Sequence, residues 1–287
     1  MDAATIGSMT SPACSGRLHV IETRPVAGGR APARIDAVLV VGSELLTAHL
    51  GFVLRWSLAE ERAAAPVARH VVPPFYRSKL FPLATGGFAL VGTAESTDEV
   101  RLVVVDADGS ASEPRALPRG EYSVLTDGRV VREIYANGTT SLEVPRADGR
   151  GEPSRCWNFT RAVLDERTGR VLLGGSETIG VLEPNGELRT ARVKGHTSAL
   201  AIHRGQLVRC QKVSVGSEVH GELETFDVET LAQTSTTSCG PIQAFASGGT
   251  TLASLGSYGV VTTGIVPCGG QAAARPTRAS LSTRFAV

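Results

Sequence analysis

Short apolar runs separated by turn residues recur along most of the chain. The clearest stretch extends from Phe159 to Cys210, where runs rich in Val, Leu and Ile alternate with Thr168-Gly169, Asn185-Gly186 and Arg204-Gly205. Runs of this kind, bounded by Gly and Asn, predict strands joined by hairpins. The pattern that begins at Phe159 starts again near Thr197, which indicates an internal repeat.

A glycine that opens an apolar strand marks the repeat. It occurs at Gly87, Gly128, Gly169, Gly205 and Gly249, and successive copies are 36 to 44 residues apart. A second marker follows between two further strands, at Asp108-Gly109, Asp148-Gly149 and Asn185-Gly186. Glycine supplies the positive φ angles of tight turns, so each unit is predicted to hold about four short strands.

A four-stranded unit that recurs at about 40 residues is typical of a β-propeller blade. The predicted units are Ala33–Pro74, Phe75–Arg119, Gly120–Cys156, Trp157–Gly195, His196–Gly240 and Pro241–Val266. The repeat region therefore resembles six-bladed β-propellers, all-β domains of four-stranded antiparallel blades. The degenerate ends leave five or seven blades open. A two-sheet sandwich is the other alternative, but it does not require so even a spacing.

The two ends of the chain differ from the repeat. Leu18–Thr23 is a lone strand that we expect to pair with the short last unit and close the ring, which removes an open sheet edge. Residues 18–266 are thus predicted to form one propeller domain, preceded by a flexible segment 1–17 and followed by a loose extension 267–287. Ser57–Ala65 is alanine-rich and predicts either a helical turn or a charged outer loop.

Composition excludes several classes of partner. The 287 residues are 42% hydrophobic, which provides a sizeable core, and carry 29 basic against 28 acidic residues, so no basic field favours nucleic acid. No apolar run approaches the ~20 residues of a membrane helix. The lack of a secretory signal and the five dispersed cysteines predict a cytoplasmic protein.

One set of candidate residues lies in the loops that lead into the innermost strand of each unit. Three successive units place Glu121, Asn158 and His196 at comparable positions. An acid, an amide and an imidazole that converge on the propeller axis could hold Ca²⁺, Mg²⁺ or Zn²⁺ and activate water. The competing interpretation is that these are ordinary solvated loop residues.

Aromatic and cationic residues of the same loops point to a different role. Tyr76, Arg77, Tyr122 and Trp157 are expected to gather on one sector of the loop-rich face, and these residue types are enriched at binding hot spots. Trp157 alternatively packs between blades as core. A second set of loops on that face carries Glu95, Asp98, Glu99, Tyr135, Glu177, Glu218 and His220.

The motifs of several functional families are absent. The chain lacks a Gly-x-Ser-x-Gly elbow, the Trp-Asp ending of WD40 blades and the sialidase Asp-box. The first hypothesis is therefore a non-catalytic propeller without a cofactor that binds a peptide or protein on its loop-rich face. The alternative is a metal-dependent hydrolase, lactonase or lyase with Glu121, Asn158 and His196 as ligands. A sugar lectin is a third hypothesis. It is disfavoured because sugar-binding propellers usually carry an aromatic residue in each blade, and aromatic residues make up only 5% of this chain.

Overall fold

The chain folds into antiparallel β-sheets arranged around an axis. The computed structural model describes residues 20–21, 35–41, 43–57, 66–94, 97–215, 218–239, 242–248, 251–256 and 261–263. The predicted flexible segment 1–17, the extension 267–287 and most of the alanine-rich patch at 57–65 lie outside these residues. The described part contains strands and no helix, so it holds no helix long and apolar enough to cross a membrane.

Three four-stranded sheets come first along the chain, each with its strands in sequence order. The first consists of β2 (Ala37–Val41), β3 (Glu44–His49), β4 (Phe52–Ser57) and β5 (Ala68–Val71). The second consists of β6 (Phe75–Pro82), β7 (Phe88–Ala94), β8 (Val100–Val105) and β9 (Arg115–Leu117). The third consists of β10 (Glu121–Val124), β11 (Val130–Ala136), β12 (Thr139–Val144) and β13 (Ser154–Trp157).

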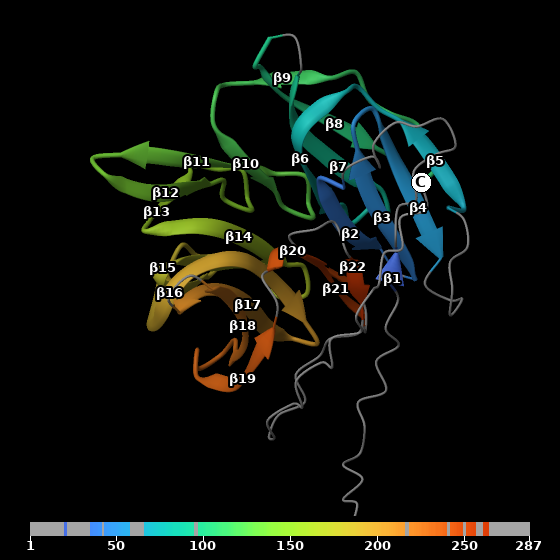
Figure 1. Cartoon of the computed structure of the whole chain (residues 1–287). Helices are drawn as coiled ribbons and strands as arrows, with labels where there is room; N and C mark the ends of the chain where they lie inside the picture. The colour runs from blue at the N-terminus through green and yellow to red at the C-terminus, as the bar shows by residue number, and fades with distance from the viewer. Residues whose placement is uncertain are drawn as a thin grey trace, which may run out of the picture.

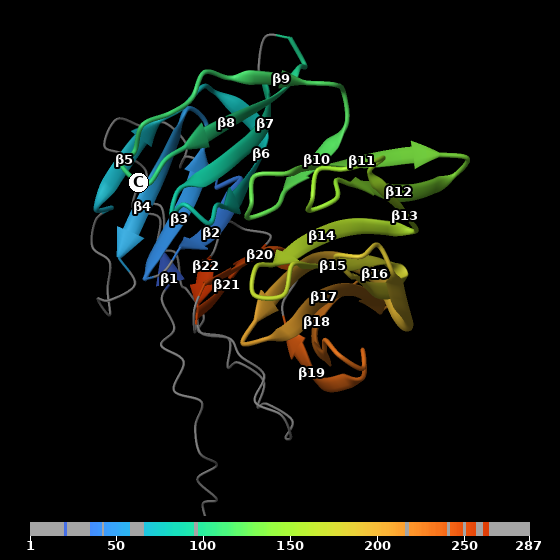
Figure 2. The same ribbon diagram turned by 180° about the vertical axis from the view of Figure 1, so that it is seen from behind.

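A six-stranded sheet and one more four-stranded sheet complete the fold. The six-stranded sheet consists of β14 (Phe159–Asp165), β15 (Arg170–Leu182), β16 (Leu188–His203), β17 (Gln206–Val215), β18 (Glu218–Asp227) and β19 (Gln233–Cys239). The last sheet consists of β20 (Ile242–Gly248), β21 (Thr251–Gly256), β22 (Val261–Thr263) and β1 (Val20–Ile21). Figure 1 shows the sheets following one another around the molecule, and the view from behind in Figure 2 shows β20–β22 between the first sheet and the six-stranded sheet.

The fold is a β-propeller, but the predicted number of blades was wrong. The structure has four four-stranded blades rather than six, because the predicted fourth and fifth units form one six-stranded sheet. The predicted boundary at Gly195 and His196 lies inside β16, which is a single strand although Gly195 has a positive φ of 69°. The first part of β16 pairs with β15 and its second part, from Thr197, pairs with β17. One continuous strand thus serves two units.

The N-terminal strand completes the last sheet, as the sequence predicted. Val20 pairs with Thr262 and Ile21 pairs with Val261, in antiparallel register. Gly87 does not have the predicted role, because the positive φ of its turn, 85°, is at Gly86. The other described glycine markers do, since Gly128 at the first kind of turn and Gly186 at the second have φ angles of 84° and 91°. Both turns use the left-handed region that glycine adopts without a steric penalty.

The outermost strands of the first two sheets are the least buried. Nearly every residue of β7 is buried, whereas β5 and β9 hold no buried residue. Neighbouring sheets cover both faces of the inner strands, which explains why these strands are apolar without strict alternation. The core accordingly lies between sheets, and one of its clusters joins Val91 and Leu102 of the second sheet to Tyr122 and Val124 of the third.

A buried arginine fixes the place where β16 passes from one unit to the next. The Arg209 side chain is fully buried on β17, and its Nη1 lies 2.5 Å from Oε2 of Glu224, the residue opposite it on β18. Its Nε donates to Thr197 Oγ1 at 2.8 Å, and its Nη2 donates to the carbonyl oxygens of Lys194 and Gly195. Thr197 Oγ1 in turn donates to Gly175 O of β15. One guanidinium therefore links β16, β17 and β18.

Loss of this arginine should destabilise the fold strongly. Arg209→Met leaves the buried Glu224 carboxylate without its counter-charge, so we expect the free energy of unfolding in urea to fall by about 3–5 kcal/mol. The double variant Arg209→Met/Glu224→Leu removes both charges and should lose clearly less than the single variant. A double variant as unstable as Arg209→Met would show that the ion pair does not cause the loss.

Candidate functional site

A cavity of about 660 Å³ lies on the axis of the propeller. Its wall comes from the first strands of successive units: β2, β6, β10, β14 and the second part of β16. The wall is mainly apolar and includes Val38, Leu39, Leu80, Val124, Val163 and Leu200. The backbone of β20 contacts both β2 and β16, so the strands around the axis form a closed ring. The volume falls within the usual range of small-molecule sites.

Irregular pairing marks the beginning of several strands of this ring. The register shifts between Tyr76 and Lys79 in β6, between Phe159 and Arg161 in β14, and between Thr197 and Ala199 in β16. β20 has the same kind of shift near Ile242. An extra residue twists a strand and redirects its side chains, and bulges are common at rims and beside functional sites.

Charged side chains gather where β6, β10 and β14 begin. Lys79 Nζ lies 2.5 Å from Glu121 Oε2, and Glu121 pairs with Glu133 across the β10–β11 hairpin. Arg161 Nη1 donates to Thr160 O at 2.8 Å and lies 4.0 Å from Glu133 Oε2. Lys79 and Arg161 line the cavity, as does the exposed Arg77. We call Arg77, Lys79 and Arg161 the cationic mouth.

Burial controls the protonation of the acid behind the mouth. It raises the pKa of Glu133, while the positive charges of Arg161 and Lys79 act in the opposite direction and do not fully offset it. The negative charge of Glu121 adds to the increase. The acid nearest to Arg161, Glu133, is therefore 4.0 Å away, and burial opposes its ionisation.

The four predicted binding residues have different environments. Tyr76 and Trp157 are 42% and 46% exposed, so the alternative that Trp157 is core was wrong. Arg155 lies over the Trp157 ring, with Cζ 5.7 Å from the ring centroid. Arg77 is exposed at the mouth with a φ of 51°. Tyr122 is buried instead, and its hydroxyl donates to Pro118 O at 2.6 Å, so it is a core residue below that surface.

The three predicted metal ligands each have contacts with other parts of the protein. Glu121 forms the ion pair with Lys79, and His196 Nδ1 lies 3.0 Å from Ser176 Oγ. Asn158 has a φ of 64°, and its carbonyl oxygen packs so tightly on Gly175 that a Cβ there would lie 1.8 Å from it. In the part of the chain that the structure describes, no three His, Cys, Asp or Glu side chains form a metal-binding group.

The described members of the second set of loops have separate environments. Glu99 is ion-paired with Arg101, whereas Asp98 and Glu177 have left-handed backbones. Tyr135 is 74% exposed. Glu95 and the side chains of Glu218 and His220 lie outside the described residues.

Sequence reasoning missed Lys79 and Arg161. Both stand inside apolar strands, in Ser-Lys-Leu-Phe and Thr-Arg-Ala-Val, whereas the predicted site residues lie in the loops before the strands. A cation within an otherwise apolar inner strand was the signal that could have found them, because such a residue must face either water or a counter-charge.

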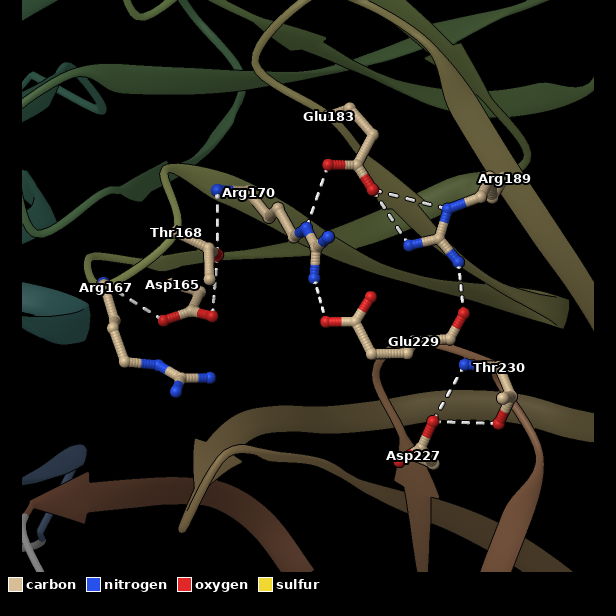
Figure 3. A network of polar contacts seen from close by, with 9 residues as sticks. All are labelled: Asp165, Arg167, Thr168, Arg170, Glu183, Arg189, Asp227, Glu229 and Thr230. Atoms are coloured by element: carbon tan, nitrogen blue, oxygen red, sulfur yellow. Dashed lines mark hydrogen bonds and ion pairs between the residues drawn. The ribbon is translucent and has the colours of Figure 1, made fainter.

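A second polar network lies at the other end of β14 (Figure 3). Arg170 donates to Glu183 and Glu229, and Arg189 donates to Glu183 and to the backbone of Glu229. Asp165 accepts hydrogen bonds from Thr168 and Arg167, and Asp227 accepts them from Thr230 in the same way. These contacts tie the turns after β14, β15 and β18 together, so we assign the network a structural role.

Comparison with known proteins shows similarity of fold only. No family model and no curated protein matches the chain. Among solved structures, Hsv2 of Kluyveromyces marxianus is similar, with a TM-score of 0.50 and 10% identity over 84% of this chain and 76% of that one. Hsv2 of Kluyveromyces lactis has a TM-score of 0.49 and 11% identity over 78% and 70% of the two chains. A streptogramin B lyase has a TM-score of 0.48 and 8% identity over 86% and 97%. Of these, only the likeness to the Kluyveromyces marxianus structure bears on the fold, and it agrees with a β-propeller.

The buried acid behind the mouth gives a pH-dependent prediction. Because its folded-state pKa is raised, Glu133 binds a proton more readily in the folded than in the unfolded chain, and its ionisation costs stability as pH rises. The variant Glu133→Gln does not lose stability in this way, because a glutamine side chain does not ionise. The stability of the variant relative to the parent, measured by urea unfolding, should therefore increase from about pH 4 to about pH 7.

A matched control is Glu187→Gln, which replaces an exposed glutamate on the turn between β15 and β16. Its stability relative to the parent should change little with pH. If the advantage of Glu133→Gln instead shrinks as pH rises, then Arg161 and Lys79 stabilise the ionised carboxylate more than burial destabilises it.

Proposed function

We propose that the protein is a non-catalytic β-propeller that binds an acidic, extended segment of a peptide or protein on its loop-rich face. A scaffold or binding role fits the fold. The observation that carries the proposal is a pair of exposed aromatic residues, Tyr76 and Trp157, on the facing walls of two neighbouring sheets.

The register of the second sheet defines one wall. Tyr76 pairs with Thr93, Thr93 pairs with Val100, and Val100 pairs with Leu117, so these four side chains lie on one face. Val100 and Leu117 pack against the cluster that contains Tyr122 of the third sheet. The face that carries Tyr76 is therefore the face turned toward the third sheet.

The register of the third sheet defines the opposite wall. Ile134, Ser141 and Trp157 form one cross-strand row. The parallel row one pair away consists of Tyr122, Arg132, Glu143 and Arg155, on the same face. Since Tyr122 packs against the second sheet, Trp157 faces that sheet as well. Tyr122 then forms the floor between the two walls.

The charge of these walls favours an acidic ligand. Arg119 is exposed beside the floor, and Arg132 Nη2 donates a long hydrogen bond of 3.4 Å to Arg119 O. Arg155 lies 3.7 Å from the single nearby acid of its row, Glu143, and keeps half of its side chain exposed. Arginine combined with Tyr and Trp is the composition typical of binding hot spots. Arginine also pairs with carboxylates in a bidentate manner.

Binding of defined peptides tests this function. The probes are fluorescein-labelled octapeptides with one apolar scaffold and Glu, Ser or Lys at alternate positions, measured by fluorescence anisotropy. We expect the Glu peptide to bind most tightly. Trp157→Ala, Tyr76→Ala and Arg132→Gln should each weaken it by about tenfold or more, with an unchanged unfolding midpoint.

Tyr135→Ala is the matched control, because Tyr135 is an exposed aromatic residue on the opposite face of the same sheet. It should bind the Glu peptide as the parent does. Equal affinity for the Glu, Ser and Lys peptides, or an equal loss in Tyr135→Ala, would contradict the proposal.

The metal-dependent hydrolase remains a separate prediction with its own test. Because Glu121 is already ion-paired with Lys79, we expect that neither EDTA nor added Ca²⁺, Mg²⁺ or Zn²⁺ shifts the thermal unfolding midpoint. A midpoint that rises with one metal in the parent but not in Glu121→Ala or His196→Ala would favour the hydrolase instead. The cytoplasmic location and the absence of membrane and nucleic-acid partners also stay predictions.

A further inference from the structure

The axial cavity is a second potential binding site, distinct from the walls that carry Tyr76 and Trp157. Its middle is apolar, with Leu80, Val124 and Val163 contributed by three different strands. The lining also includes the polar residues Ser78 and Ser198, whose hydroxyls donate to Phe75 O and Cys210 O. An apolar enclosure with a few placed polar groups is the usual form of a small-molecule site.

The charges around the cavity are unevenly compensated. Lys79 is satisfied by Glu121 at 2.5 Å. Among the described residues, the only acid paired with Arg161 is Glu133, at 4.0 Å. Arg77 forms no ion pair or hydrogen bond with any described side chain. The other charged residues of the wall are Asp36, Asp165, Glu166 and Arg167, the last three at the far end of β14. Asp36 interacts with another group of the protein.

The backbone holds Arg77 in an unusual conformation at the mouth. Its φ of 51° lies in the left-handed region, at the register shift between Tyr76 and Lys79. Non-glycine residues in this region are uncommon, and such strain clusters at ligand sites. The bulge also keeps Ser78 buried, with its hydroxyl donating to Phe75 O. Arg77 is thereby presented to the cavity and not to the sheet.

Arg161 reaches the same mouth from β14. Its guanidinium is positioned by two backbone carbonyl oxygens, Thr160 O at 2.8 Å and Ser198 O at 3.4 Å. Carbonyl oxygens orient the group without neutralising its charge. A fixed, weakly compensated guanidinium is a strong partner for a carboxylate or a phosphate, whose oxygens accept two parallel N–H bonds.

We propose that the axial cavity binds a small organic anion. The apolar body of the ligand lies between Leu80, Val124 and Val163, and its carboxylate or phosphate group is held at the mouth by Arg77 and Arg161. Lys79, already paired, adds positive potential. This site is independent of the peptide surface, and either one can fail without the other.

Thermal unfolding with four probes of equal chain length tests the proposal: octanoate, octyl phosphate, 1-octanol and octylamine. A ligand that binds only the folded chain raises the unfolding midpoint by mass action. Octanoate or octyl phosphate, at millimolar concentration, should raise the midpoint by about 2 °C or more, and the larger of the two shifts identifies the head group. The alcohol and the amine should give clearly smaller shifts.

Variants at the mouth make the test specific. Arg77→Gln and Arg161→Gln should each weaken anion binding in titration calorimetry by about tenfold or more. Arg161→Lys, which keeps the charge, should bind with intermediate affinity and guards against a folding defect in Arg161→Gln. Arg101→Gln is the control, because Arg101 is ion-paired with Glu99 away from the cavity and should leave binding unchanged.

Three outcomes would overturn the inference. Equal shifts with octanoate and octanol would show an apolar cavity without an anion site. Full retention of anion binding in Arg77→Gln and Arg161→Gln would place the bound anion elsewhere. No shift with any probe would show that the cavity does not take small ligands. None of these outcomes bears on the binding of the acidic octapeptides.

Discussion

The buried contact between Arg209 and Glu224 is the constraint on which the least regular part of the propeller depends. At this point β16 passes from one unit to the next without a loop, so its carbonyl groups at Lys194 and Gly195 need a donor inside the protein. Burial raises the pKa of Glu224 and lowers that of Arg209, because both charges are costly away from water. A costly pair kept at a junction suggests that it specifies strand position more than it adds stability.

The ring of inner strands connects this constraint to the candidate sites. Sheets packed face to face force the inner strands to be apolar on both sides, and the axial cavity receives an apolar wall for the same reason. The cations of these inner strands stand beside register shifts, where a bulge redirects side chains. Arg161 and Arg77 are two of these cations. The cationic mouth is therefore a consequence of the same packing that stabilises the fold.

Much of the architecture could be predicted from the sequence, because turn glycines and apolar runs are local signals. They identified the strands, the repeat and the pairing of the N-terminal strand with the last sheet. The blade count was wrong because Gly195 resembles a turn glycine although its φ of 69° occurs inside a continuous strand. The burial of Tyr122 could not be predicted from the local sequence either, because a neighbouring sheet covers its side chain. Lys79 and Arg161 were missed because ion pairs between sheets leave no fixed spacing in sequence.

The pairing of β1 with β22 has a kinetic consequence. Val20 and Thr262 are 242 residues apart in the sequence, so the contact that joins them closes a very long loop. Contacts of this kind form late, because closing a long loop must precede any gain from the contact. During synthesis the strand at Val20–Ile21 leaves the ribosome before all the other described strands and has no partner until β22 has been made. For that period the first sheet exposes a face that the last sheet later covers.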